Sequence, residues 1–393
     1  MNIVIHRYNS ICEPDFIDAF KALGINVIED KAEMTRKDIS LDERVRVLGE
    51  MILKEQPLFV FSINYFPYIA MICEKLKCLY VCVSVDCPVV ELFSETIKSS
   101  FNRVFLFDRA QFDEISRYNP ECVFHMPLGV NVERINNTLG EPKWNDYKYE
   151  VSFVGSLYNE KDPLAQIMQS LPVKEMGYCH GLLAAQSLFP GQELIEECIS
   201  EDLITALKNA DKGFYPSDLN ITNTDKFVAV NNYLSYHLTA QDRLIALNQM
   251  AQIARVDLFT RSNTEKLKNV NCHGGVSSLV EMPQVFRQSK INLNMTMRAI
   301  KAGLPQRIWD VLGSGGFLLT NFQSELPEQL EIGKHLAAYE TIDEACELIQ
   351  YFLTHEDERL EIAHNGYEFV RNNHTVLNRV AEMIKFITGT LSI

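Results

Sequence analysis

Long apolar runs, a signal peptide and an excess of positive charge are all missing from this chain. No uninterrupted apolar run reaches the roughly 18 residues that a membrane-spanning helix needs. The first residues, MNIVIHRYN, follow a strand pattern at once and lack the charged start and apolar core of a signal peptide. The 52 Asp and Glu residues outnumber the 37 Lys and Arg residues, and the net charge of −15 argues against general affinity for nucleic acid or anionic membranes. We therefore expect a cytoplasmic protein with no transmembrane segment and no nucleic-acid partner.

Metal-binding and disulfide patterns are missing too. The ten cysteines include no CxxC pair, so neither a disulfide framework nor a zinc site is expected. Cys73, Cys78, Cys82 and Cys87 are clustered, but most of them fall in apolar helix and strand patterns, as small core residues of a reducing compartment do. No DxD motif ends a strand, and Mg²⁺ would need such carboxylate ligands. The sequence therefore predicts no metal site.

Short apolar runs alternate with helical patterns along most of the chain, which predicts an α/β protein with mainly parallel sheets. Residues 1–145 are expected to form a first Rossmann-like domain, on the acceptor side, with one of its helices near Leu92–Ser99. Residues 146–375 are expected to form a second, nucleotide-sugar-binding domain. A helix-leaning stretch at about 165–250 predicts an insertion, suited to acceptor recognition, to packing or to a homodimer contact. The last helix, about 376–393, is expected to pack back on the first domain.

Two doubly wound domains that face each other place ligands at the carboxyl ends of their strands. This is the outline of the GT-B glycosyltransferase fold, but some epimerases and phosphorylases share it. The fold alone therefore does not choose the reaction.

The segment 304–320, LPQRIWDVLGSGGFLLT, is the most informative stretch of the chain. It predicts an amphipathic helix, a glycine-rich turn and a buried strand. Arg307 and Asp310 are three residues apart and share a helix face, just ahead of glycines that let a ligand approach the backbone. A cation, a carboxylate and bare amides together suit a nucleotide diphosphate. The structural alternative is a helix C-cap that leads into a strand.

Several segments resemble the CgeB-like, or spore-maturation-protein-like, glycosyltransferases. They are FVFSINYFPYIAMICEKLKCLYVCVSVDCP, VFLFDRAQFDEI and HMPLGVNVER in the first half, and VSFVGSLY, INLNMTMRAIKAGLPQRIWDVLGSGGFLLTN and YFLTHEDERLEIAHNGYEFVRNNHTVLNR in the second. The resemblance implies a GT-B fold, a nucleotide sugar held by the second domain, and no metal. The chain is more distantly similar to the retaining family with a paired-glutamate motif. Asp310 falls at the second acid of that pair, whereas Ala302 stands at the first.

Without a metal, the charge of a diphosphate must be met by Arg, Lys and backbone amides. We expect the donor nucleotide sugar, a UDP- or GDP-sugar first of all, to be the only co-substrate besides the acceptor. Asp310 is expected to accept from the ribose hydroxyls, and Asn294 to meet the ligand or tie down a loop. Gly274 lies where GT-B folds contact the base, by analogy of fold. The residues expected to meet the diphosphate are Gly155, Ser156, Arg261, Arg298, Arg307, Gly315 and Gly316.

Two residues are candidates for the catalytic base. Asp86 ends the strand pattern YVCVSVD, where a carboxylate can face the other domain and accept a proton from the acceptor hydroxyl. Its alternative role is to cap the next helix. His6 ends the first strand and is the second candidate, although a lone His there is often structural.

The leading interpretation is a glycosyltransferase of the hexosyltransferase type that moves a sugar from a nucleotide-diphosphate donor to an acceptor. The resemblance implies a surface glycan, a glycoprotein or a spore-coat component of a bacterium as that acceptor. Two alternatives stay open: a nucleotide-sugar epimerase of the same fold, and a non-catalytic GT-B partner subunit. Hydrolysis of the donor in the absence of an acceptor would distinguish the glycosyltransferase from the non-catalytic subunit.

Overall fold

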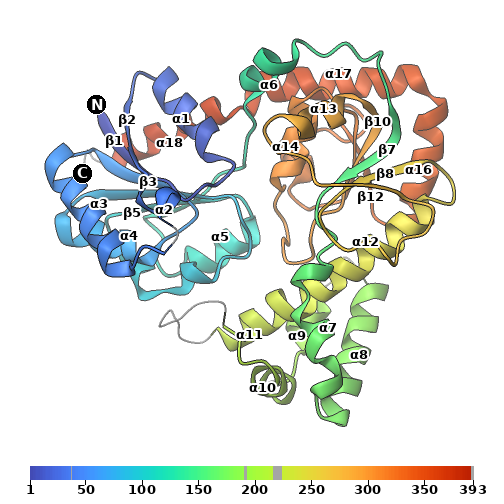
Figure 1. Cartoon of the computed structure of the whole chain (residues 1–393), viewed down its shortest axis with the longest axis horizontal. Coiled ribbons are helices and arrows are strands. Elements are labelled where there is room, and N and C mark those ends of the chain that lie inside the picture. Colours follow the sequence, from blue (N-terminus) through green and yellow to red (C-terminus); the bar gives the residue numbers. More distant parts are fainter. Residues whose placement is uncertain (37, 190–192, 216–223, 391–393) are drawn as a thin grey trace.

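The computed structural model describes residues 1–36, 38–189, 193–215 and 224–390. Two α/β domains lie side by side, and a helical body extends from the second one (Figure 1). Each domain is built on a sheet of six parallel strands. The predicted fold class, two Rossmann-like domains of the GT-B type, is confirmed.

The N-terminal sheet has the strand order β2-β1-β3-β4-β5-β6. Its central strands are buried along almost their whole length because helices cover both faces, so they are mostly apolar. The strands are β1 (Asn2–His6), β2 (Asn26–Asp30), β3 (Phe59–Ile63), β4 (Leu79–Ser84), β5 (Asn102–Leu106) and β6 (Val123–His125).

The helices of this domain follow the strands in the expected alternation, with one correction. The helix expected near Leu92–Ser99 is two 3₁₀ turns, because Ser94 between them has extended backbone and its hydroxyl bonds to that of Thr96 at 2.6 Å. The helices and turns are α1 (Glu13–Ala22), α2 (Ala32–Thr35), α3 (Leu41–Glu55), α4 (Pro67–Leu76), η1 (Val90–Phe93), η2 (Glu95–Lys98), α5 (Arg109–Ile115) and α6 (Val132–Leu139).

The C-terminal sheet has the order β12-β11-β10-β7-β8-β9. Both edge strands have three residues, too few to show a period, and the sequence did not reveal them. The strands are β7 (Tyr149–Val154), β8 (Val256–Phe259), β9 (Asn271–His273), β10 (Ser289–Asn294), β11 (Leu318–Asn321) and β12 (Ala337–Tyr339). The helices are α13 (Glu281–Arg287), α14 (Gln306–Gly313), α15 (Leu326–Gln329), α16 (Ile342–Thr354) and α17 (Glu356–Asn373).

Every described element between β7 and β8 is helical, and this part of the chain forms the lower body in Figure 1. It has its own apolar core, which includes Leu164, Cys179, Leu203 and Tyr233. Its elements are η3 (Asn159–Lys161), α7 (Pro163–Ile167), η4 (Met168–Ser170), α8 (Val173–Leu188), α9 (Leu194–Cys198), α10 (Glu201–Ala210), α11 (Asp225–Val228), the π-helix η5 (Ala229–Ser235) and α12 (Tyr236–Met250).

The chain crosses back to the N-terminal domain after α17. Val130 and Thr375 form a parallel bridge, and α18 (Val376–Thr390) packs against α1. Gly129 permits this crossing, because a Cβ there would lie 2.8 Å from the carbonyl oxygen of His374. All ten cysteines are free thiols. Within the described part of the chain, every helix is too short or too polar to span a bilayer.

Candidate functional site

Helix α14 carries Arg307 and Asp310 to the interface between the two domains. Gln306, in its first turn, donates through Nε2 to the carbonyl oxygen of Gly129 at 2.9 Å and to Oδ1 of Asp310 at 3.0 Å. Asp310 is thereby held against the N-terminal domain. Burial raises the pKa of Asp310, and the charge of Arg307 opposes that rise. The two residues that the sequence singled out do lie together.

Arg307 is a half-buried cation that forms no ion pair with the described residues. Its guanidinium lies 5.4 Å from the ring centre of Phe286, and its Nε and Nη1 atoms are buried with no hydrogen-bond partner among the described residues. Burial lowers the pKa of Arg307, against the pull of Asp310. Buried N–H groups of a cation that lack hydrogen bonds are costly, so this side chain is suited to an anionic ligand.

A second cation, the buried Arg243 of α12, lies close enough to Arg307 to be affected by its charge. It donates through Nη1 to the carbonyl oxygen of Ser156 at 2.6 Å and through Nη2 to that of Met295. Its guanidinium lies 4.8 Å from the ring centre of Tyr158, and no carboxylate forms an ion pair with it among the described residues. Burial lowers the pKa of Arg243 to about 10, and the charge of Arg307 adds to that effect. Positive potential therefore accumulates at this point of an acidic protein.

The N-terminal domain presents Asp86 to the same interface. Asn64 positions it: Nδ2 of Asn64 donates to Oδ2 of Asp86 at 2.6 Å, while Oδ1 of Asn64 accepts from the backbone of Val85 at 3.0 Å. Asp86 is exposed. Burial raises the pKa of Tyr236 to about 12, and the negative charge of Asp86 adds to that rise, so the Asp86 carboxylate is close enough to affect a residue of the helical body.

His6 lies apart from this interface, inside the N-terminal domain. It is 1% exposed, its Nδ1 lies 2.9 Å from Oδ2 of Asp30, and its Nε2 lies 3.1 Å from the hydroxyl of Tyr68. Burial lowers the pKa of His6, but hydrogen bonds to Asp30 and Glu33 outweigh it and raise the pKa overall. With both ring nitrogens occupied, the environment favours the structural role that the sequence left open.

Gly155 and Ser156 follow β7, and their groups are largely committed to the protein. The amide of Gly155 donates to the carbonyl oxygen of Phe259 at 3.0 Å. The hydroxyl of Ser156 donates to Glu160 at 2.6 Å, and its carbonyl oxygen holds Arg243. The amide of Gly155 is therefore committed to the sheet and the carbonyl oxygen of Ser156 positions Arg243, while the amide of Ser156 donates to no acceptor among the described residues and stays available to a ligand.

Arg261 and Gly274 lie at the carboxyl ends of β8 and β9. Arg261 is exposed, with no ion pair or hydrogen bond among the described residues, and it covers Gly275, where a Cβ would lie 2.5 Å from its Cγ. Gly274 is exposed with open space beside it. Both stay available to a ligand.

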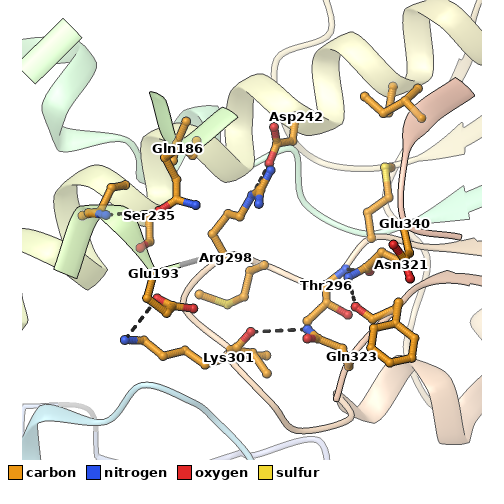
Figure 2. Close-up of a pocket in the computed structure, with 18 of the residues that line it drawn as sticks. Gln186, Glu193, Ser235, Asp242, Thr296, Arg298, Lys301, Asn321, Gln323 and Glu340 are labelled. Carbon is orange, nitrogen blue, oxygen red and sulfur yellow. Dashed lines mark hydrogen bonds and ion pairs between the residues drawn. The ribbon is translucent and has the colours of Figure 1, made fainter. Parts of the chain in front are cut away.

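Arg298 is paired with an acid of the helical body. Its Nε donates to Oδ2 of Asp242 at 2.6 Å, in a cavity of about 410 Å³ between the helical body and the ends of β10, β11 and β12. Figure 2 shows this pair on one side of the cavity and Lys301 with Glu193 on another. Asn294 is 4% exposed and donates to the hydroxyls of Thr296 and Thr320. Of the two roles left open for Asn294, these contacts match the tying of a loop.

The expectation that the amides of Gly315 and Gly316 meet a ligand is wrong, because both amides are bonded within the chain. They donate to the carbonyl oxygens of Leu312 at 2.9 Å and Val311 at 3.0 Å, which is the C-cap alternative. Gly315 has φ +83°, and its carbonyl oxygen accepts from the indole of Trp144 at 2.8 Å. The glycines are needed for this turn and for close packing against the interdomain linker.

Ala302, at the first acid of the paired pattern, faces an acid from the other domain. Oδ2 of Asp108 accepts from the amides of Lys301, Ala302 and Gly303 at 3.0, 2.9 and 2.8 Å. Asp108 is 1% exposed, and its Oδ1 caps α5 through the amide of Gln111. The loop after β10 is therefore fixed to the N-terminal domain by one carboxylate.

Sequence reasoning missed Arg243, Asn64 and Asp108. Arg243 lies in the helical body, far along the chain from the other site residues, and one Arg in a helix carries no signal. Asp108 had a detectable signal, since it ends the pattern VFLFD directly before a helical pattern, as an N-cap residue does. Among the described residues, no three His, Cys, Asp or Glu side chains gather as a metal site would need.

Comparison with known proteins agrees with this architecture. Residues 243–385 match a family described as glycosyl transferase-like. A glycosyltransferase from Rickettsia africae has a TM-score of 0.53 at 11% identity, covering 99% of this chain and 98% of that one. HepE from Anabaena, solved with UDP and glucose, has a TM-score of 0.53 at 11% identity, covering 98% and 99%.

Sucrose-phosphate synthase from Thermosynechococcus elongatus has a TM-score of 0.51 at 9% identity, covering 99% of this chain and 100% of that one. No curated protein sequence matches this chain. Similarity at these identities shows the fold. The chain therefore has the GT-B fold, and its C-terminal part, residues 243–385, matches the glycosyl transferase-like family.

Proposed function

We propose that this protein is a glycosyltransferase that binds a nucleotide-diphosphate sugar between its domains and transfers the sugar to an acceptor hydroxyl. The observation that carries the proposal is the pair of cations formed by half-buried Arg307 and buried Arg243. Arg307 has two buried nitrogens without a partner among the described residues, and Arg243 adds its charge nearby. A diphosphate would supply the missing acceptors and the missing negative charge.

The other residues take roles that follow from their positions. Asp310, held by Gln306, would accept from the ribose hydroxyls, and Arg261 with Gly274 would lie on the side of the base. Asp86, oriented by Asn64, would face the acceptor. Charge on the departing nucleotide diphosphate would be met by Arg307 without a metal ion.

The donor and the acceptor class come from similarity. HepE was solved with UDP and glucose, so a UDP-sugar is the first donor to test, with a GDP-sugar second. The resemblance to CgeB-like proteins makes a surface glycan, a glycoprotein or a spore-coat component the acceptor class, and a hexosyl group the transferred unit.

Thermal stabilisation by UDP, GDP, dTDP, CDP and ADP tests the donor site. A ligand at about 100 times its dissociation constant adds about 2.7 kcal/mol to the stability of the native state. We expect one diphosphate to stabilise the wild type and the Arg298→Gln control, and to leave Arg307→Gln and Asp310→Asn unchanged. Equal shifts in all four proteins, or none, would contradict the proposal. Release of the nucleotide from the sugar donor without acceptor would then separate a transferase from an epimerase or a silent subunit.

A further inference from the structure

A cavity of about 380 Å³ lies between the N-terminal domain and the helical body, and we name it the η5 cavity. Residues from both domains and from the helical body line it. Cys87 and Pro88 come directly after Asp86, Ala299 and Lys301 come from the loop after β10, and Asn231 comes from η5. The cavity therefore adjoins the residue proposed to face the acceptor. The helical body, which the donor site uses only through α12, supplies much of its wall.

Aromatic side chains form part of this wall. The rings of Phe93 and Phe227 lie 4.6 Å apart, and those of Phe93 and Tyr118 lie 6.4 Å apart. Tyr118 remains 48% exposed. An aromatic face offers an apolar, rigid surface on which the C–H face of a sugar ring can lie.

Two side chains of the cavity each have a buried polar atom without a partner among the described residues. Gln111 is 6% exposed, and its Oε1 accepts from the amide of Val89 at 3.2 Å, while its Nε2 is unpartnered. Asn231 is 5% exposed, and its Nδ2 donates to the carbonyl oxygen of Phe227 at 3.0 Å, while its Oδ1 is unpartnered. The cavity thus combines one unmet donor with one unmet acceptor, and a hydroxyl group can satisfy both kinds.

The charges of the cavity are nearly balanced. Four carboxylates line it, Asp108, Asp113, Glu114 and Glu196, against three cations, Arg117, Lys226 and Lys301. Lys301 is already paired with Glu196. No excess of positive charge is left for a phosphorylated or otherwise anionic ligand. Asn231 also lies on a π-helix, a distortion that is frequent at functional sites.

We propose that the η5 cavity binds a neutral pyranose unit of the acceptor saccharide, with its ring against Phe227, Phe93 and Tyr118 and its hydroxyls between Gln111 and Asn231. The role as acceptor site rests on the proposed glycosyltransferase function. The binding of a neutral saccharide does not.

An array of neutral, sialylated and phosphorylated glycans, probed with the full-length protein, tests the binding. The strongest glycan is then titrated calorimetrically against variants. We expect a neutral glycan to bind, and Asn231→Ala and Tyr118→Ala to weaken it about tenfold, the loss of one good contact. Asn232→Ala is the matched control, because Asn232 is the next residue along and lines a different cavity. Tyr118 is exposed, so Tyr118→Ala should fold normally and still tests the cavity if Asn231→Ala, at a buried position, does not fold.

Binding of anionic glycans only, no binding at all, or equal affinity in the three variants would overturn the proposal. The same proteins are tested for stabilisation by nucleoside diphosphates, which none of these substitutions should change. If the diphosphate still stabilises a protein that binds no glycan, the η5 cavity inference fails and the donor site stands. If a neutral glycan binds with the expected pattern but no diphosphate does, the cavity stands and the proposed function fails.

Discussion

The chemistry of this protein depends on single side chains whose partners come from distant parts of the chain. Arg307 and Asp310 could be singled out from the sequence because they are three residues apart on one helix. Arg243 could not, because its position beside Arg307 depends on how α12 packs under the loop after β10. Whether a charged side chain is buried and lacks hydrogen-bond partners depends on the three-dimensional structure, so the sequence alone does not show it.

Gly303 shows the same dependence on distant neighbours. A Cβ at this position would lie 2.7 Å from Cα of Asp108 and 2.8 Å from the carbonyl oxygen of Phe107. Because backbone atoms cannot move aside cheaply, Gly303→Ala should lower the free energy of unfolding by about 1–3 kcal/mol. Urea unfolding measures the change, with Gly274→Ala as control, since open space surrounds Gly274. Equal stability of the two variants would contradict the claim that Gly303 packs directly against the backbone of Phe107 and Asp108.

At the scale of elements, apolar runs and their alternation were sufficient to predict two parallel sheets. Turns and edges were less predictable. The sequence of Leu92–Ser99 has a helical pattern, but the extended backbone at Ser94 divides it into two 3₁₀ turns. Strands β9 and β12 are too short to show a period. The sequence suggests that Gly315 and Gly316 contact a ligand, but their amides form the C-cap of α14. Local sequence did not distinguish a glycine that serves a turn from one that serves a ligand.

The junction of α17 and α18 carries a pH-dependent element. Burial, with Arg379 and His335 nearby, lowers the pKa of His374 from 6.5 to about 4, and its ring stacks on Trp309 at 4.7 Å. The unfolded chain therefore takes up the proton first as the pH falls. The stability due to neutral His374 is complete above about pH 6.5 and is lost toward pH 4, with a total on the order of 3 kcal/mol.

Urea unfolding of the wild type and His374→Gln at pH 7.5 and pH 5 measures this contribution. The variant should lose less stability than the wild type over that interval, whatever its stability at pH 7.5. Parallel losses in the two proteins would show that His374 does not titrate in this way.

At the scale of the whole molecule, two buried carboxylates fix the domains to each other. Asp108 accepts three amides of the loop after β10, and Glu325 accepts from the amide of Arg109 at 2.7 Å and lies 2.8 Å from His125. Each carboxylate belongs to one domain and its donors to the other. The relative placement of the domains is therefore built from specific hydrogen bonds, and no sequence pattern could have predicted it.

Asp108→Asn tests this arrangement. Both carboxylate oxygens of Asp108 accept from backbone amides, so the NH₂ group of Asn would face an N–H donor in place of an acceptor. The variant should therefore be less stable by about 1–3 kcal/mol. Hydrogen exchange at the amides of residues 301–303 should accelerate. Asp113→Asn, on the exposed side of the same helix, is the control. Unchanged exchange in Asp108→Asn would mean that other contacts hold the domains.

The central claim is that a diphosphate binds at Arg307, and ³¹P NMR observes those phosphorus atoms directly. UDP is titrated with wild-type protein, and GDP is used if UDP does not bind. We predict that both diphosphate resonances shift and broaden with the wild type and with Arg298→Gln, and keep their free positions with Arg307→Gln. Resonances that respond equally to Arg307→Gln and the wild type, or that never respond to either nucleotide, would contradict the account.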